Sequence, residues 1–293
     1  MTELYKKYRP AKLVEMVGQD TIIESVREMI LKESLPRALL LSGPSGCGKT
    51  TMARILRKAL KCSEMDFTEM NSADDRGVEA IRKIRSRMNL APIQGKCRIW
   101  LLDECHSMTA VAQQALLKIL EDTPSHVYFF LCTTDPQKLI KTIRTRCTEL
   151  RFQSISPEDA SQLISDIAEK EEKNPPSDSV IEAITEVSGG SARKILVLLE
   201  QILWIQDEEK QLEIIYQSRD QQAGEFIGKL LMNSKTKWKD LMSAVDRAAD
   251  QDVESLRRGI LGYAYAVLKK GKSPRAYKII ESCRDNWFDS GKA

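Results

Sequence analysis

The sequence predicts an α/β domain with a mostly parallel sheet, then a small helical domain and a final helical domain. Three observations predict this. Short apolar runs alternate with segments of helical period up to about residue 155, no strand pattern follows that point, and residues from about 207 onward have helical period throughout. Because parallel neighbours need a crossover connection, this alternation favours a parallel sheet flanked by helices. We expect the domains to span residues 1–154, 155–206 and 207–293.

The first domain is expected to alternate strands and helices. The predicted strands are 37–43, 66–71, 98–102, 127–134 and 148–155. The predicted helices are 20–30, 51–60, 77–90 and 109–121. Apolar residues at helical spacing predict each helix, and Asp20 is a candidate N-cap for the first one.

The helical part of the chain begins at a clear start signal. Ser156 stands at an N-cap position, Pro157 follows at the first helical position, and Asp159 comes three residues after the cap. The run "NPPS" at 174–177 ends this helix. Two further helices are predicted over 178–187 and 191–205, and connections are predicted at 233–234 and 271–274.

Composition is that of a soluble globular protein. The 293 residues are 42% hydrophobic and 30% charged, with a formal net charge of +3. No apolar run reaches the roughly 18 residues that a membrane span needs, and the start lacks a secretory signal. The seven cysteines form an odd set without a CxxC pair, which indicates reduced thiols in a cytoplasm and argues against a zinc knuckle.

The run "GPSGCGKTT" at 43–51 fits the pattern G-x-x-x-x-G-K-[ST] between a predicted strand and a predicted helix. Glycines let the backbone turn its N–H groups toward phosphate oxygens, Lys49 can reach the β- and γ-phosphates, and Thr50 can ligate Mg²⁺. A glycine-rich turn with a chance lysine is the structural alternative, and the strand–helix context disfavours it. The candidate nucleotide-binding residues of this loop are Gly43, Pro44, Ser45, Gly46, Cys47, Gly48, Lys49, Thr50 and Thr51. Cys47 is read either as a small filler or as a redox-sensitive thiol, and the filler role is favoured.

Two acids follow the apolar run of the predicted strand at 98–102. Asp103 and Glu104 would lie at the carboxyl end of this strand, where open α/β sheets bind ligands. Asp103 suits the Mg²⁺ shell, and Glu104 suits orienting and deprotonating an attacking water. His106 is either a polar link to another surface or a packed histidine, and packing is slightly favoured.

Two basic features have no obvious acidic partner. The run "TDPQKLIKTIRTRC" at 134–147 ends with Arg144 and Arg146, which suggests that an anion lies nearby. Between Arg76 and Arg98 there are seven Lys or Arg residues and a single acid, Glu79. This second stretch is either a solvated helix face or a nucleic-acid contact.

Taken together, "LYKKYRPAKLVEMVGQDTII" and the run from "APIQGKCRIWLLDECH" to "TIRTRC" resemble the ATPase subunits of sliding-clamp loaders. These are AAA+ proteins, and the central run is similar to the gamma/tau subunit of bacterial DNA polymerase III and to replication factor C small subunits. The resemblance covers about residues 3–205. It implies a phosphate-loop α/β domain, a helical lid and an all-α collar. It also implies a Mg²⁺-dependent ATPase, stimulated by DNA and clamp, that places a clamp on primer–template DNA.

Further site residues come from this resemblance. Arg146, in Thr145-Arg146-Cys147, matches an arginine that reaches the γ-phosphate held by a neighbouring subunit, with threonine in place of the usual serine. An arginine paired to a surface acid is the structural alternative. Thr134 matches a polar sensor beside Glu104, and Thr133 is the neighbouring alternative. Arg193 matches a lid residue over the nucleotide. The residues expected along the adenine are Tyr8, Arg9, Pro10, Val17 and Gly18.

The resemblance also implies partners. Arg82 and Arg85 are expected to face DNA phosphates from one side of the 77–90 helix, and the surface at 89–94 is where relatives bind the clamp. A finger acting in trans implies other loader subunits, in a pentameric ring or spiral, inside a bacterial or phage-infected cell. Only Cys62 and Cys97 stand where bacterial relatives carry a four-cysteine module, so no zinc is expected, and the long polymerase-tethering tail of a tau form is missing.

Three other functions share features with this sequence. "DECH" also resembles a helicase box, but such a helicase needs two RecA-like domains and this chain has room for one. A non-catalytic scaffold should have a degraded phosphate loop, and this loop is intact. Another AAA+ replication or helicase-loading ATPase is the alternative that stays open, although residues 207–293 contain no strand pair for a winged helix.

Overall fold

The computed structural model describes residues 3–234, 236–248, 253–271 and 273–284. The chain divides into two compact units. The first holds Met1–Pro176 and Ser188–Glu200, and the second holds Ser177–Val187 and Gln201–Ala293.

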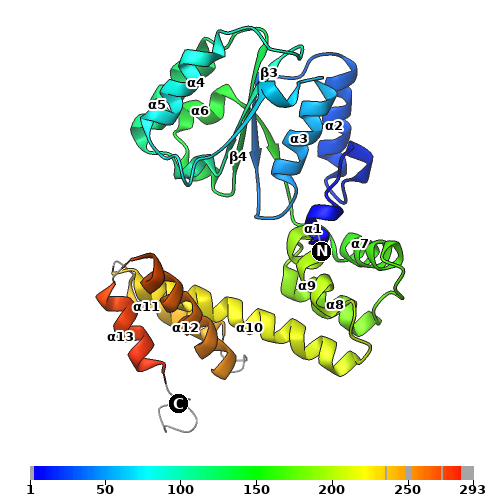
Figure 1. Cartoon of the computed structure of the whole chain (residues 1–293), viewed down its shortest axis with the longest axis vertical. Helices are drawn as coiled ribbons and strands as arrows, with labels where there is room; N and C mark the ends of the chain where they lie inside the picture. The colour runs from blue at the N-terminus through cyan, green and yellow to red at the C-terminus, as the bar shows by residue number, and fades with distance from the viewer. Residues whose placement is uncertain (1–2, 235, 249–252, 272, 285–293) are drawn as a thin grey trace. The chain divides into compact units, whose positions relative to one another are not determined.

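One five-stranded sheet organises the first unit (Figure 1). Its strands are β1 (Ala38–Ser42), β2 (Phe67–Asn71), β3 (Arg98–Asp103), β4 (Val127–Thr133) and β5 (Thr148–Arg151). They are all parallel, in the order β2-β3-β4-β1-β5, with Leu40 paired to Leu131 and Leu102 also paired to Leu131 across β4. The predicted parallel sheet is confirmed, and its last strand is shorter than expected.

Helices cover both faces of this sheet. The helices of the first unit are α1 (Leu4–Lys7), α2 (Asp20–Leu31), α3 (Lys49–Ala59), α4 (Val78–Met88), α5 (Ala110–Glu121), α6 (Lys141–Arg146) and α7 (Pro157–Lys170). Of these, α2 and α3 contribute to one core layer on the sheet and α4, α5 and α6 to the other. Single 3₁₀ turns lie at Leu13–Glu15, Glu64–Asp66, Cys105–Ser107 and Pro136–Lys138. Helix α9 (Ala192–Ile202) begins in this unit, because residues up to Glu200 belong to it.

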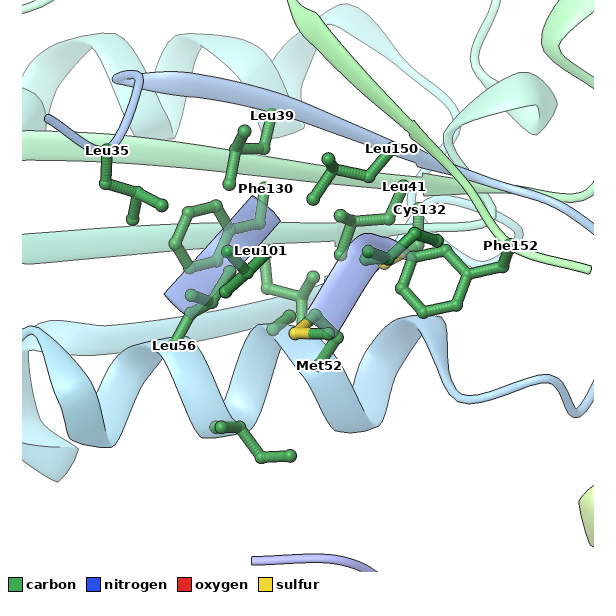
Figure 2. Packing of buried hydrophobic residues seen from close by; sticks show 14 of the residues in the cluster. Leu35, Leu39, Leu41, Met52, Leu56, Leu101, Phe130, Cys132, Leu150 and Phe152 are labelled. Carbon is green, nitrogen blue, oxygen red and sulfur yellow. The ribbon is translucent and has the colours of Figure 1, made fainter. Parts of the chain in front are cut away.

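The core lies in two layers because successive strand residues face opposite sides. Leu39 and Leu41 of β1 pack with Met52 and Leu56 of α3 in one layer (Figure 2). Leu40, between them in sequence, belongs to the other layer, which includes buried residues of α4 and α5. The two layers hold the sheet rigidly, so the loops at its carboxyl edge have a fixed base.

The helix starts show where local signals are sufficient and where they are not. The hydroxyl of Ser156 accepts a hydrogen bond from the backbone N–H of Asp159 at 3.0 Å, as the sequence predicts. Asp20, expected as an N-cap, is instead the first residue of α2, and Gln19 is the N-cap. The side chain of Gln19 bonds the backbone of Gln153 in both directions, at 2.6 and 3.0 Å. This contact, distant in sequence, sets where α2 begins.

The second unit is helical. Its helices are α8 (Asp178–Ser188), α10 (Glu208–Met232), α11 (Trp238–Asp246), α12 (Val253–Lys270) and α13 (Pro274–Ser282). A Cβ built on Gly224 of α10 would lie 2.2 Å from the carbonyl oxygen of Leu256, so glycine lets α10 and α12 approach closely. The predicted connection at 233–234 falls between helices. In the one predicted at 271–274, Pro274 is already the first residue of α13, and Lys272 lies outside the described residues. Among the helices that the structure describes, none is long and apolar enough to cross a membrane.

Candidate nucleotide-binding site

The sequence-predicted residues meet at the carboxyl edge of the sheet. The loop 43–51 follows β1, Asp103 ends β3, and Thr133 ends β4. These three strands are neighbours in the order β3-β4-β1, and Ser42 pairs with Thr133 in the register. The topology therefore brings the glycine-rich loop and the two acids to one place.

Two glycines of the loop are required by both conformation and close packing. Gly43 and Gly46 have φ values of 144° and 76°, in the region that favours glycine. A Cβ on Gly43 would lie 2.3 Å from the carbonyl oxygen of Phe152, and one on Gly46 would lie 2.2 Å from Ser191 Oγ. The loop is thus packed against the segment that starts α9, as well as shaped to turn its N–H groups outward.

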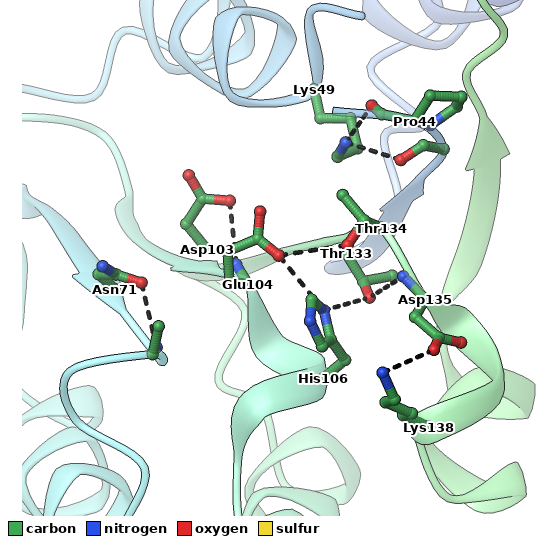
Figure 3. Close-up of polar contacts among 12 residues, drawn as sticks. Pro44, Lys49, Asn71, Asp103, Glu104, His106, Thr133, Thr134, Asp135 and Lys138 are labelled. Atoms are coloured by element: carbon green, nitrogen blue, oxygen red, sulfur yellow. Dashed lines mark hydrogen bonds and ion pairs between the residues drawn. The ribbon is translucent and has the colours of Figure 1, made fainter. Parts of the chain in front are cut away.

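Lys49 begins α3 and is buried, with 6% of its surface exposed. Its ammonium donates hydrogen bonds to the carbonyl oxygens of Gly43 at 2.8 Å and Pro44 at 2.6 Å (Figure 3). Next in the helix, Thr50 Oγ1 donates to Asp103 Oδ2 at 3.0 Å. A hydroxyl and a carboxylate held this close are the oxygen donors that Mg²⁺ prefers, so these two residues fit that ion.

Glu104 has a backbone φ of 49°, which a non-glycine residue adopts at a cost and which is common at functional sites. Its Oε2 lies 3.4 Å from Thr134 Oγ1 and 3.3 Å from His106 Nδ1 (Figure 3). The same ring nitrogen is 3.1 Å from Thr133 Oγ1. Thr134, the residue predicted from the resemblance, is therefore the threonine that contacts the acid. His106 contacts both Glu104 and Thr133 within the site, and a link from the site to another surface stays a prediction.

A cavity of about 770 Å³ opens beside these groups. Its volume is in the range of small-molecule sites. The predicted residues that line it are Tyr8, Arg9, Pro10, Val17, Ser45, Gly46, Cys47, Gly48, Lys49, Thr50, Thr51, Asp103, Glu104 and Arg193. Among the predicted residues that do not line it are Gly18, Gly43, Pro44, Thr134 and Arg146.

The prediction missed other residues that line the cavity. They are Tyr5, Lys7, Ala11, Val14, Glu15, Met16, Leu163, Asp166, Ile167, Lys170, Ala192 and Leu196. Leu163 and Ile167 stand four residues apart on α7, so helical spacing already placed them on one face. No local pattern indicates what that face of α7 contacts.

Basic side chains lie close to Arg9 at the wall of the cavity. Burial lowers the pKa of Arg9, and the nearby guanidinium groups of Arg54 and Arg193 lower it further. Like charges brought together in this way are stabilised when a negative ligand lies among them. Burial raises the pKa of the Cys47 thiol, although Lys49 acts in the opposite direction. A thiol that is kept protonated is a poor redox sensor, so the filler reading of Cys47 is the better one.

Arg146 has an acidic partner that its own sequence neighbourhood did not reveal. Its Nη2 lies 2.5 Å from Oε1 of Glu121, the last residue of α5, and the side chains are 46% and 39% exposed. Arg144 donates a hydrogen bond from Nη1 to Gln137 Oε1 at 3.2 Å. The run 134–147 itself contains no acidic partner for Arg146, and the nearby anion that the sequence suggests is Glu121 of the same chain.

The predicted DNA- and clamp-facing residues lie on the surface of the first unit. Arg82 and Arg85 are exposed on α4, and Arg82 forms an ion pair of 2.5 Å with Glu79. Leu90 and Ile93 are 56% and 65% exposed in the segment after α4. These positions are compatible with partner contacts and do not identify a partner.

The cysteines are all reduced. Cys62 and Cys97 are both buried in the same core layer as α3. Across the part of the chain that the structure describes, no three His, Cys, Asp or Glu side chains gather as a metal site would require. The expectation of no zinc stays a prediction.

Comparison with known proteins gives the class and then the family. Residues 1–89 match the family model described as the Rad17 P-loop domain, and residues 64–156 match the model for the DNA polymerase III delta subunit. The structure of RuvB from Thermotoga maritima superposes with a TM-score of 0.61 at 18% identity, covering 92% of this chain and 94% of that one. The fold is therefore that of an AAA+ P-loop ATPase.

Relatives with higher sequence identity to this chain identify the family within this class. The replication factor C small subunit of Methanococcus maripaludis is 37% identical over 215 residues, which is 72% of this chain and 67% of that protein. The DNA polymerase III subunit gamma/tau of Mycobacterium tuberculosis is 34% identical over 223 residues, which is 68% of this chain and 38% of that protein. The chain belongs to the clamp-loader family of AAA+ proteins. The match spans well under half of the mycobacterial relative's length.

Proposed function

We propose that this protein is an ATPase subunit of a sliding-clamp loader. ATP binding would serve to open the clamp and place it on primer–template DNA, and hydrolysis would release it. The observation that carries the proposal is the meeting of Lys49, Thr50, Asp103 and Glu104 beside one cavity, in a chain of this family. An arrangement of a phosphate loop with two acids suits hydrolysis of a nucleoside triphosphate.

Each of these residues has a distinct task in the proposed reaction. Lys49 is to exchange its two loop carbonyls for the β- and γ-phosphates, since an ammonium has three donors and binds phosphate as a point charge. Mg²⁺ held by Thr50 and Asp103 neutralises phosphate charge when bound. Glu104 is to take a proton from the attacking water, with Thr134 orienting its carboxylate.

Arg146 is proposed to act as an arginine finger that contacts the nucleotide bound by a neighbouring subunit. Two features support this: it does not line the cavity of its own chain, and its ion pair with Glu121 is nearly half exposed. Such an exposed ion pair contributes only about 0–1 kcal/mol to stability. Breaking it so that the guanidinium can contact an incoming phosphate therefore costs little free energy. An arginine finger contributes ~10³ to 10⁵ in rate where it has been measured.

Partners and domains belong to the same proposal. We expect residues 1–154 to be the ATPase domain, 155–206 the lid and 207–293 the collar that joins subunits in a hetero-oligomer. Arg82 and Arg85 would contact DNA phosphates, and a cytoplasmic setting, in a bacterial or phage-infected cell, stays a prediction.

The proposal is tested by steady-state ATPase assays with Mg²⁺, with and without a purified sliding clamp and primer–template DNA. We expect clamp and DNA to stimulate wild-type turnover. Arg146→Ala should lose that stimulation, whereas Lys141→Ala, which removes an exposed cation on the same helix, should keep it. Glu104→Gln should bind ATP and hydrolyse it at least about 100-fold more slowly.

Mixing the two inactive variants tests the geometry in trans. Arg146→Ala and Glu104→Gln chains should recover part of the stimulated rate together, because a mixed junction can hold an intact Glu104 beside an intact Arg146. An Arg146→Ala protein with full stimulated turnover would contradict the finger assignment. A wild-type chain that hydrolyses ATP with no response to clamp or DNA would contradict the clamp-loader function.

A further inference from the structure

Residues 4–9, here called the N-terminal strap, form part of the wall of the cavity. Tyr5, Lys7, Tyr8 and Arg9 of the strap all line it. The strap contains only the four-residue helix α1. Because so short a helix is not stable by itself, other contacts must hold the strap in place.

A single carboxylate holds the middle of the strap. Oε1 of Glu171, the residue directly after α7, accepts hydrogen bonds from Lys7 Nζ and from Tyr8 Oη, each at 2.6 Å. The side chain of Glu171 is only 15% exposed, although that of Lys7 is 49% exposed. Glu171 does not line the cavity, so its effect on a ligand must pass through the strap.

Two weaker contacts tie the strap to α9. The backbone N–H of Leu4 donates to Glu200 Oε2 at 3.2 Å. The guanidinium of Arg193 lies 5.6 Å from the centre of the Tyr5 ring, within the range of a cation–π contact. Arg193 also lines the cavity, so the position of the strap affects a second residue that faces the ligand.

We infer that Glu171 is a positioning residue for nucleotide binding, which fixes the N-terminal strap against the base-binding side of the cavity. The inference rests on the proposed function, because it takes the ligand to be a purine nucleotide. Tyr8 is expected beside the base, whereas Lys49 and the phosphate loop line another part of the wall. A strap that is already ordered does not have to be immobilised when the ligand binds, and this raises affinity.

The inference predicts a particular pattern of affinities. Because the strap contacts the base side, loss of Glu171 should weaken a diphosphate and a triphosphate by the same factor. A change in the phosphate loop should instead weaken the two to different extents. Equal weakening is therefore a readout that distinguishes strap positioning from disturbance of the phosphate site.

The test is a fluorescence titration of the full chain with the methylanthraniloyl derivatives of ADP and ATPγS. We expect Glu171→Ala to raise both dissociation constants about tenfold, which corresponds to ordering one or two side chains. Glu169→Ala is the matched control, since Glu169 is an exposed acid on α7. Its dissociation constants should equal those of the wild type.

Exchanging the charges of Lys7 and Glu171 distinguishes loss of their ion pair from a folding defect. Lys7→Glu alone should bind both nucleotides weakly, and the double variant Lys7→Glu, Glu171→Lys should recover part of the affinity, because the ion pair is restored although the carboxylate that accepts from Tyr8 Oη is not. The inference is overturned if Glu171→Ala binds as the wild type does, or if the exchange binds no better than either single variant. If the wild type binds neither probe, the proposed function fails instead.

Discussion

Asp66 shows how one buried carboxylate can organise a surface. It is 1% exposed and accepts hydrogen bonds from the backbone N–H groups of Ile93, Gln94 and Gly95, at 2.7, 3.0 and 3.0 Å. Arg98 lies 3.5 Å away and is also buried. The segment that these contacts hold is the one that exposes Ile93, so a core residue fixes the shape of the expected clamp-facing surface.

Stability should depend on pH through Asp66. Burial alone would raise the pKa of this carboxyl, but the N–H groups of Gln94 and Ile93 outweigh burial and hold the pKa well below its usual value. Because the folded pKa is depressed, the stabilisation is complete above the unfolded pKa of about 3.9 and is lost as pH falls below it. The wild type should therefore lose more free energy of unfolding between pH 5 and pH 2 than Asp66→Asn does.

Urea denaturation at each pH measures this difference. Asp66→Asn should also be less stable at pH 7, by about 2–4 kcal/mol, because it leaves the Arg98 guanidinium buried without its charge partner. Asp75→Asn, at an exposed acid, is the control and should follow the wild type. Identical pH slopes for wild type and Asp66→Asn would show that this carboxyl is not the source.

At the scale of elements, the phosphate loop and the start of α9 are fitted to each other. The backbone N–H of Arg193 donates to the carbonyl oxygen of Gly46 at 3.4 Å, and Ser191 Oγ occupies the place where a Cβ of residue 46 would be. The glycine-rich loop and the helix that carries Arg193 are therefore in direct contact at Gly46. A substitution in the glycine-rich loop should therefore affect both the loop and the start of α9.

Gly46→Ala should weaken nucleotide binding for two separable reasons. The added methyl would lie 2.2 Å from Ser191 Oγ, and the backbone has a φ of 76°. Adding Ser191→Ala removes the close contact but leaves the backbone strain, which costs about 1–2 kcal/mol for an L-residue. The double variant should thus recover only part of the affinity.

Titration with fluorescent ADP measures each step of this series. Gly77→Ala is the control, because nothing lies within 4 Å of a Cβ at Gly77 and its φ is −88°. Its affinity should be unchanged. Full recovery in the double variant would mean that only the steric contact matters.

At the scale of the whole molecule, a bound nucleotide should stabilise only one of the two units. Every residue that lines the cavity belongs to the first unit, which holds Met1–Pro176 and Ser188–Glu200. A ligand stabilises the part that binds it, by about 2.7 kcal/mol at a concentration 100 times its dissociation constant.

Hydrogen exchange measured by mass spectrometry tests this division. Saturating ATPγS in the isolated chain should slow amide exchange in peptides from 43–51 and α3, and leave exchange in α12 unchanged. The physical reason is that local opening of a unit is suppressed only by a ligand bound to that unit. Equal protection of α3 and α12 would show that the two units open together.

Much of the fold and part of the site followed from local signals. The parallel sheet, the phosphate loop with Lys49, and the acids after β3 were all predicted, because strand alternation, glycine spacing and apolar runs are written in neighbouring residues. The predictions for individual residues were less complete. The predicted helix 20–30 begins at the right residue, but its N-cap is Gln19, which contacts Gln153, and not Asp20. His106 proved to be a link between Glu104 and Thr133.

By itself, the sequence determined that a phosphate loop and two carboxylates stand at the carboxyl ends of buried parallel strands, because these patterns depend on near neighbours and on the period of the backbone. Only the tertiary structure decided which distant side chains meet them. It paired Arg146 with Glu121, and it brought Glu171 to Lys7 and Tyr8 across more than 160 residues. Such contacts depend on where the packed core places each backbone segment, and no local pattern encodes that position.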